Sequence, residues 1–186
     1  MLTGCVPWPE EFSRRYRELG FWEGISLFEM LRRSAETTPD KIALIDGEHR
    51  CSYAGLIRES ERLAAGLHGM GLRPLDRVIF QFGNGLEFVF AFLGLLRAGV
   101  IPVMALPAHR RVEVGQWARH AGAVAYFVPG RSGNFDFGAM AREVAAEHRA
   151  LRWIVVAGEA GEGHIALASL RAAGERALAA GRNPPP

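Results

Sequence analysis

The stretch from Arg77 to Leu106 constrains the fold more than any other part of the chain. It begins with a short β-rich run, Arg77 to Phe82, which ends at the turn Gly83-Asn84-Gly85. The segment Leu86 to Ala98 is apolar on almost every face, and a second apolar run follows from Val100 to Leu106. A helix that is apolar all round is buried on more than one side, and near-continuous apolar strands are typical of parallel sheets. The stretch predicts a β–α–β unit at the centre of an α/β domain.

The apolar helix is too short to cross a membrane. Glu87 and Arg97 bound an apolar segment of roughly half the ~20 residues that a bilayer crossing requires. We therefore interpret it as a buried helix and expect no membrane association.

Length and composition are those of one globular domain. With 186 residues, 49% of them hydrophobic and 23% charged, the chain is long enough to bury a sizeable core. The net charge of +2 is too small to indicate a nucleic-acid partner. Arginine clusters such as Arg110-Arg111 have no aromatic interleaving, so we interpret them as solvated faces.

Cysteine usage and the N-terminus carry no sign of export or redox chemistry. Cys5 and Cys51 are too few and too far apart for a metal or redox motif. The N-terminus has no charged segment followed by an apolar one, so we predict no signal peptide. We expect a cytoplasmic protein.

The first third of the chain predicts helices and a hairpin. Trp8-Pro9-Glu10-Glu11-Phe12 is typical of a helix start. Phe12, Tyr16 and Leu19 then recur at helical spacing and form one apolar stripe. Ser26 and Glu29 fit a capping box for a second helix.

The inner face expected for that second helix consists of Leu27, Met30 and Leu31. Asp46-Gly47 predicts a β-hairpin. Ser52 is placed to cap a third helix that runs to about Met70.

Beyond the central unit, strands and helices alternate. We expect, in order, a helix at 111–121, a strand at 123–128, a helix at 135–148, a strand at 151–157 and a helix at 165–180. This alternation predicts a doubly wound parallel sheet flanked by helices, with an N-terminal helical segment and a small β-hairpin. Residues 1–181 would form this unit, and 182–186 a Pro-rich linker.

The turn Gly83-Asn84-Gly85 is the first candidate site. It follows a strand and opens a helix, where a phosphate could accept bonds from free N–H groups. However, Phe88 occupies the place of the third glycine in a dinucleotide-binding motif. A tight turn with Asn84 near the N-cap explains these residues as well, and we favour that interpretation.

The histidines do not form a metal-ligand pattern. They are scattered over the chain: His49, His68, His109, His120, His148 and His164. His109 is the most interesting, because Pro107 to Arg111 follow the carboxyl end of a strand, where α/β sheets bind ligands. A role in a surface loop or helix cap remains the favoured explanation.

No other residue type assembles a catalytic constellation. Ser34 and Ser132 lack the setting of a nucleophile elbow. Carboxylates such as Glu10, Glu11, Glu143 and Glu147 are typical of exposed helix faces. The sequence thus names no catalytic, cofactor-binding or metal residues.

Four segments resemble the aryl-acid–AMP ligases, which activate 2,3-dihydroxybenzoate or salicylate in siderophore synthesis. The run Trp8 to Trp22 closely resembles their opening segment. Ile45 to Glu48 with Ser52-Tyr53 is similar to the first core motif of adenylation domains, and Leu95 to Val103 to the second. Leu106 to Arg110 is similar to a loop of the aryl-acid branch. The resemblance implies the N-terminal subdomain of an adenylate-forming enzyme.

Two departures from the family pattern bear on function. Gly55 stands where the first motif usually carries Glu, which affects only local stability. More important, family members continue into a phosphate-binding loop, an aryl pocket and a C-terminal lid with a catalytic lysine. Lys41, the only lysine here, matches neither functional lysine of the family.

The resemblance implies an N-terminal fragment of an aryl-acid–AMP ligase. ATP and magnesium as cofactors, and an aryl carrier protein as partner, are implied only for the full-length family, and none of these cofactors for this chain alone. We expect no adenylation by this chain alone, and we expect the missing remainder of the enzyme as a partner. Two alternatives stay open: a non-catalytic interaction module that complements a separately encoded remainder, and a small independent nucleotide-binding α/β protein.

Overall fold

The computed structural model describes residues 4–184, which form seven helices and nine strands. The first half contains α1 (Glu10–Glu18), α2 (Leu27–Thr37), β1 (Ile42–Asp46), β2 (His49–Ser52), α3 (Tyr53–Met70), β3 (Arg77–Phe80), α4 (Leu86–Arg97) and β4 (Ile101–Met104). The second half contains α5 (Arg111–Ala121), β5 (Ala125–Val128), β6 (Arg131–Ser132), β7 (Phe135–Asp136), α6 (Phe137–Glu147), β8 (Trp153–Val156), β9 (Ile165–Ala166) and α7 (Leu167–Ala179). The last two residues of the expected linker lie outside the described residues.

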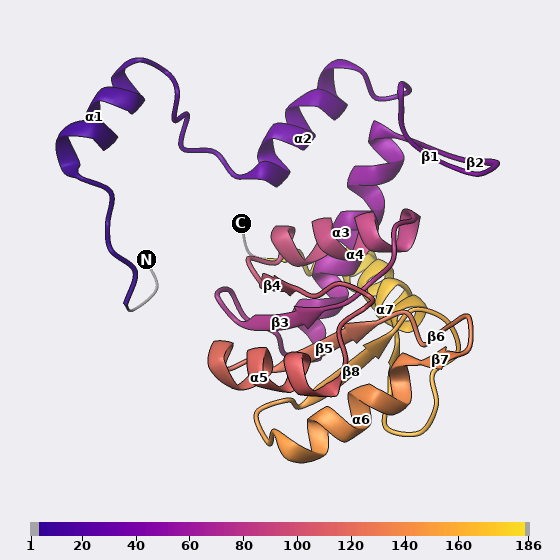
Figure 1. The fold of residues 1–186 in the computed structure, drawn as a ribbon. Helices are drawn as coiled ribbons and strands as arrows, with labels where there is room; N and C mark the ends of the chain where they lie inside the picture. Colours follow the sequence, from indigo (N-terminus) through magenta and orange to yellow (C-terminus); the bar gives the residue numbers. More distant parts are fainter. Residues whose placement is uncertain (1–3, 185–186) are drawn as a thin grey trace.

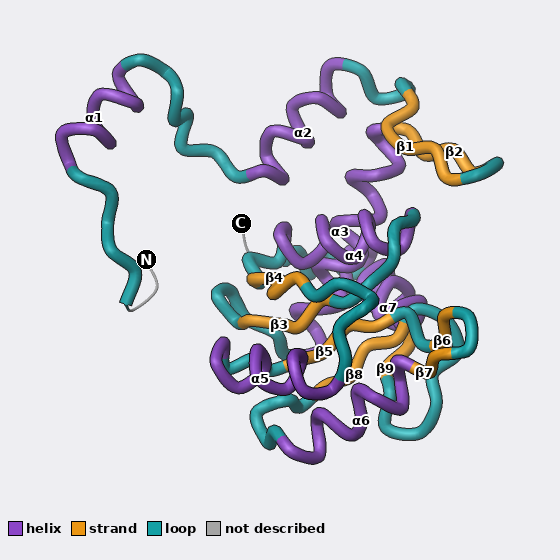
Figure 2. The backbone as a smooth tube through the Cα atoms, viewed as in Figure 1, coloured by secondary structure: helices purple, strands orange, loops and turns teal. Residues whose placement is uncertain are grey.

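The centre of the molecule is a five-stranded parallel sheet in the order β4-β3-β5-β8-β9. Figure 1 shows α3 and α4 on one side of this sheet and α5 and α6 on the other, and Figure 2 shows the strands as the layer between them. α7 packs along α3. Helices on both faces confirm the predicted doubly wound architecture.

Side-chain alternation along the strands divides the core into two clusters. On β3, Val78 and Phe80 belong to the cluster beneath α3, α4 and α7, whereas Ile79 belongs to the cluster beneath α5 and α6. On β5, Phe127 and Tyr126 divide in the same way. All five side chains are fully buried, because a strand in a doubly covered sheet has no solvent face.

The predicted β–α–β unit forms, with β3 and β4 parallel, but its expected central position is wrong. β4 is an edge strand, its residues are only partly buried, and Met104 is half exposed. The chain returns after α5 to the opposite side of β3, so β3 rather than β4 gains neighbours on both sides. An apolar sequence alone does not reveal this order.

Helix ends follow the predicted capping chemistry in part. The Ser52 hydroxyl accepts a hydrogen bond from the Gly55 N–H at 3.2 Å and caps α3, and Gly71 ends that helix in the left-handed conformation. α6 begins at Phe137 rather than Phe135, because residues 131–136 form the short hairpin β6–β7. Likewise Ile165 belongs to β9 and not to the last helix.

The expected inner face of α2 is confirmed at Leu31 and wrong at Leu27 and Met30. Leu27 and Met30 are exposed, while Phe28 and Ala35 are buried with Leu31 between them. These three residues recur at i, i+3 and i+7 and form the stripe that packs on the body. The choice between two overlapping stripes depended on what α2 packs against, which sequence did not show.

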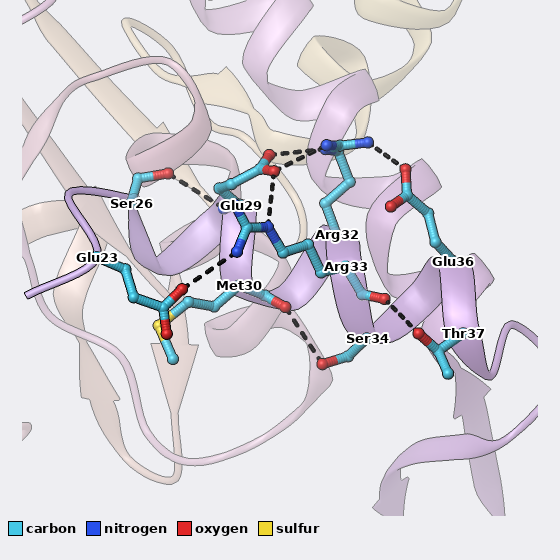
Figure 3. A network of polar contacts seen from close by, with 9 residues as sticks. All are labelled: Glu23, Ser26, Glu29, Met30, Arg32, Arg33, Ser34, Glu36 and Thr37. Atoms are coloured by element: carbon cyan, nitrogen blue, oxygen red, sulfur yellow. Dashed lines mark hydrogen bonds and ion pairs between the residues drawn. The ribbon is translucent and has the colours of Figure 1, made fainter. Parts of the chain in front are cut away.

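Only half of the predicted capping box forms on α2. The Ser26 hydroxyl accepts the Glu29 N–H at 3.1 Å, but the Glu29 carboxylate turns to Arg32 and Arg33 instead of the cap (Figure 3). The hydrogen bonds from Arg32 lower the pKa of Glu29 to about 2. Two cations within reach outcompete the single backbone N–H.

Candidate functional site

The loops that follow β3, β4, β5 and β8 meet at the carboxyl edge of the sheet. They comprise residues 81–85, 105–110, 129–130 and 157–164. In doubly wound folds this edge is where ligands bind. Two cavities open here, so we treat the edge as the candidate functional site.

Gln81 organises the loops after β3 and β4. Its side chain is fully buried, and its Nε2 donates to the carbonyl oxygens of Leu106 at 2.7 Å and His109 at 3.1 Å. Its Oε1 accepts a hydrogen bond from the hydroxyl of Tyr126. Burial raises the pKa of Tyr126, so this hydroxyl keeps its proton as a donor. Gln81 thereby ties the 106–109 loop to the middle of the sheet.

His109 lies in the loop after β4, as expected, and its side chain bonds back to the start of that loop. Its Nδ1 accepts the backbone N–H of Leu106 at 2.9 Å, and its ring meets Trp117 edge-on at 4.6 Å between centroids. Both contacts shape the turn, which supports the loop interpretation of this histidine.

Arg110, the next residue, lies with its guanidinium 4.1 Å from the ring centroid of Phe135 and donates to the carbonyl of Pro107 at 2.7 Å. The Glu113 carboxylate accepts the Arg110 backbone N–H at 3.0 Å. Backbone N–H groups, its own first and then that of Arg110, lower the pKa of Glu113. This carboxylate therefore stays charged as the cap of α5.

At the turn Gly83-Asn84-Gly85, the phosphate position is already taken by a carboxylate. Oδ2 of Asp46, from the end of β1, accepts the N–H of Leu86 at 3.1 Å. Asn84 lies near the cap as expected, directly before the N-cap residue Gly85, and the N-cap residue itself makes no side-chain bond to the helix. An anion arriving at this helix end would have to displace Asp46.

The cavity beside this turn has a volume of about 570 Å³. It is lined by the turn, by the β1–β2 hairpin and by the residues that follow β5. Two carboxylates, Asp46 and Glu87, face it, together with His49 and Arg131. Glu87 is paired through Oε1 with Arg171 at 2.6 Å. Such a lining does not fit a triphosphate, which needs an excess of cations and free N–H groups.

The second cavity, of about 550 Å³, lies between the β6–β7 hairpin, α6 and the loop after β8. Asp136 caps α6 through the Ala139 N–H at 2.8 Å and pairs with Arg131 at 3.3 Å. Arg142 lies 3.0 Å from Nε2 of His164, whose pKa is lowered by burial first and by Arg142 second. Because Glu159 also lines the cavity, its formal charges balance.

The remaining sequence candidates are not brought together. Ser34 donates to the carbonyl of Met30 at 3.2 Å, and Ser132 lies in β6. Glu143 and Glu147 both pair with Arg111. Over residues 4–184, no group of three His, Cys, Asp or Glu side chains could hold a metal ion. Within the same range, no helix is both long and apolar enough for a membrane span.

Sequence reasoning missed Gln81 and Asp46. Gln81 carried one usable signal, because it is a lone amide inside an apolar strand run. Asp46 carried none, since its partner Leu86 lies 40 positions away and only folding brings the two together.

The family of AMP-binding enzymes matches residues 31–180, which is most of the chain. The chain belongs to this family. The chain is 45% identical over 162 residues to triostin synthetase I of Streptomyces triostinicus, covering 87% of this chain and 30% of that protein. It is 42% identical over 165 residues to the salicyl-AMP ligase / salicyl-S-ArCP synthetase of Mycobacterium tuberculosis, covering 86% of this chain and 29% of that protein.

A solved structure agrees with the fold of the chain. The apo structure of MbtA from Mycobacterium smegmatis superimposes with a TM-score of 0.82 at 42% identity, covering 90% of this chain and 31% of that one. The resemblance to the N-terminal part of an adenylate-forming enzyme is thereby confirmed. The chain spans about three tenths of the length of the relatives that it matches.

Proposed function

We propose that this chain forms the N-terminal part of an aryl-acid–AMP ligase of siderophore biosynthesis. The observation that carries the proposal is the alignment of nearly the whole chain with a salicyl-AMP ligase at 42% identity. Salicylate and 2,3-dihydroxybenzoate are the proposed acids, and the cytoplasm the proposed compartment. The similarity to a triostin synthetase makes the identity of the acid a question for a substrate panel.

In the proposed reaction, an aryl carboxylate is joined to AMP from ATP with release of pyrophosphate, and a carrier-protein thiol then accepts the acyl group. The described residues do not fit the triphosphate or its magnesium ion, because Asp46 occupies the helix end and neither cavity has an excess of cations. The role of this chain is instead to supply a wall of the site. Gln81 and Tyr126 hold the 106–109 loop rigid at the sheet edge.

The test is ATP–pyrophosphate exchange with salicylate and 2,3-dihydroxybenzoate as the acids. We expect no exchange from the purified chain alone. Exchange should appear when the remaining two thirds of the M. tuberculosis salicyl-AMP ligase is added as a separate polypeptide. That polypeptide without the chain is the control. Acid-dependent exchange from the chain alone, or none with both polypeptides present, would contradict the proposal.

An independent nucleotide-binding role at Gly83 to Gly85 is the other function to test. The hydrogen bond between Asp46 and Leu86 argues against it, since a phosphate would replace a charge-assisted bond already made. Calorimetry with ATP and with NAD should show no binding to the chain alone. Replacing Asp46 by Asn is the matched variant, because it removes the negative charge but keeps an acceptor oxygen.

A further inference from the structure

Residues 4–26, here called the aromatic arm, carry an unusual share of the exposed apolar surface. Fourteen large hydrophobic side chains of the described residues are exposed, and six of them belong to the arm: Val6, Trp8, Phe12, Leu19, Phe21 and Trp22. The arm is only about an eighth of the described chain. Single exposed apolar residues are ordinary, but clusters of this kind mark interaction surfaces.

The aromatic side chains of the arm pack on one another, while Glu23 and Ser26 at its end bond to α2. The ring of Tyr16 lies 5.3 Å from that of Trp22, which in turn meets Trp8 at 6.2 Å. The N–H groups of Phe21 and Trp22 both donate to the carbonyl of Tyr16, at 2.8 and 3.1 Å. The segment after α1 therefore folds back on the helix and fixes its shape before any partner arrives.

Figure 1 shows α1 standing apart from the sheet and its helices. Phe12 and Leu19 lie at i and i+7 on one face of α1 and remain 43% and 53% exposed. Arg14 and Glu18 lie on the opposite face and are exposed as well. The arm thus presents an amphipathic helix whose apolar side has no covering among residues 4–184.

The comparison with MbtA shows that part of the arm has a counterpart in a longer relative. Residues 31–186 make up less than nine tenths of the chain, so a superposition covering 90% of it must include part of the first 30 residues. MbtA is a chain of which this one covers 31%. At least part of the arm therefore has a counterpart in MbtA. The part of MbtA that this chain does not cover is more than twice as long as the part that it covers, and it is available to pack against the arm.

We propose that the apolar face of the aromatic arm docks on the part of the adenylation enzyme that lies beyond the matched third of its relatives. The inference rests on the proposed function and names the surface through which the two parts associate. The docked face is the stripe of Phe12 and Leu19, continued by the rings of Trp8 and Trp22. The partner surface is apolar, because burial of these side chains in water-excluding contacts supplies the free energy of association.

The experiment measures binding of the chain to the separately expressed remainder of the M. tuberculosis salicyl-AMP ligase by calorimetry. The double variant Phe12→Ser/Leu19→Ser removes the apolar stripe at positions that are already exposed. The double variant Arg14→Ser/Glu18→Ser is the matched control, because it changes the opposite face of the same helix without altering net charge. Circular dichroism and thermal melting establish that both variants fold like the original chain.

We expect the stripe variant to bind the remainder about tenfold more weakly or worse, and the control variant to bind like the original chain. Equal binding by all three chains, with exchange activity restored, would overturn the docking inference and leave the proposed function standing. No binding and no restored exchange would overturn both. Dimerisation of the chain that is abolished by the stripe variant alone would assign the arm to a second copy and overturn the inference.

Discussion

Gln81 shows how much of the candidate site depends on one polar residue. It is fully buried in an apolar layer, yet it satisfies two loop carbonyls and accepts the hydroxyl of Tyr126. A buried polar group is tolerated when all of its hydrogen bonds are made. Removing it leaves each of its partners buried without a hydrogen bond. The 106–109 loop therefore depends on the sheet through this side chain.

Replacing Gln81 by Leu should lower the free energy of unfolding by about 2–4 kcal/mol, because the Tyr126 hydroxyl and two carbonyls lose their partner. Urea unfolding measures the loss, and hydrogen exchange should speed up at residues 106–109. Tyr126→Phe is the control, since it leaves Gln81 bound to both carbonyls and should cost less. A Leu variant as stable as the original chain would show that the network is not a structural support.

Tyr126 predicts a dependence of stability on alkaline pH. Burial raises its pKa above the ordinary value of 10.0, so the unfolded chain releases this proton first. The stabilisation is complete below pH 10 and is lost as pH rises from there towards the folded-state pKa. Urea unfolding between pH 9 and 11 should show a fall that is smaller in Tyr126→Phe. Identical slopes for both chains would contradict the assignment.

At the level of elements, α3 and α7 approach each other closely enough for their backbones to touch. A Cβ built on Gly66 would lie 2.1 Å from the carbonyl oxygen of Leu170, and one on Gly174 would lie 1.7 Å from that of Arg62. These two glycines let the helix backbones touch. Helix packing here thus requires glycine for space and not for backbone freedom.

Two alanine substitutions on α3 should have opposite effects. Gly66→Ala should destabilise the chain by about 1–3 kcal/mol or more, because it pushes α7 away. Gly69→Ala should stabilise it by roughly 0.5–1 kcal/mol, because Gly69 is exposed with nothing within 4 Å of its Cβ position and gains helix propensity. Thermal melting of both variants checks the pair. Similar shifts in the same direction would exclude the close contact.

Over the residues that the structure describes, two of the regions with exposed apolar side chains are of interest for association. One is the aromatic arm, and the other is the edge strand β4 with Met104 and Leu106. The outer edge of such a strand has no neighbouring strand to bond to. With apolar side chains beside it, this edge is a site where chains associate. Neither region is covered within the part of the chain that the structure describes.

We therefore predict a chain that is marginally stable and associates reversibly at high concentration when it is alone. Light scattering over a concentration series should show a rising mean mass, and thermal melting should be broad. Addition of the enzyme remainder should reduce the association, because it covers the same surfaces. A monodisperse monomer with a sharp melt would count against this prediction.

Most elements of the fold were predictable, because each is encoded by local rules. Helix α5 occurs at the predicted residues, 111–121, and the Asp46-Gly47 turn forms the predicted hairpin. The short pair β6–β7 was missed, since two-residue strands have no periodicity. The face of α2 was wrong at Leu27 and Met30, because Phe28 and Leu27 both lie on plausible stripes, and only the packed neighbour selects one.

The sequence by itself determined the α/β class, the order of helices and strands and, through motifs, the family. These depend on side-chain periodicity and on short signals that operate within a few residues. Only the tertiary structure decided that β4 is an edge strand, that Asp46 occupies the N-terminus of α4, and that Gln81 holds the loop with His109. Each of these is a contact between residues far apart in the chain, and such contacts depend on how the elements are arranged in space, which no local pattern records.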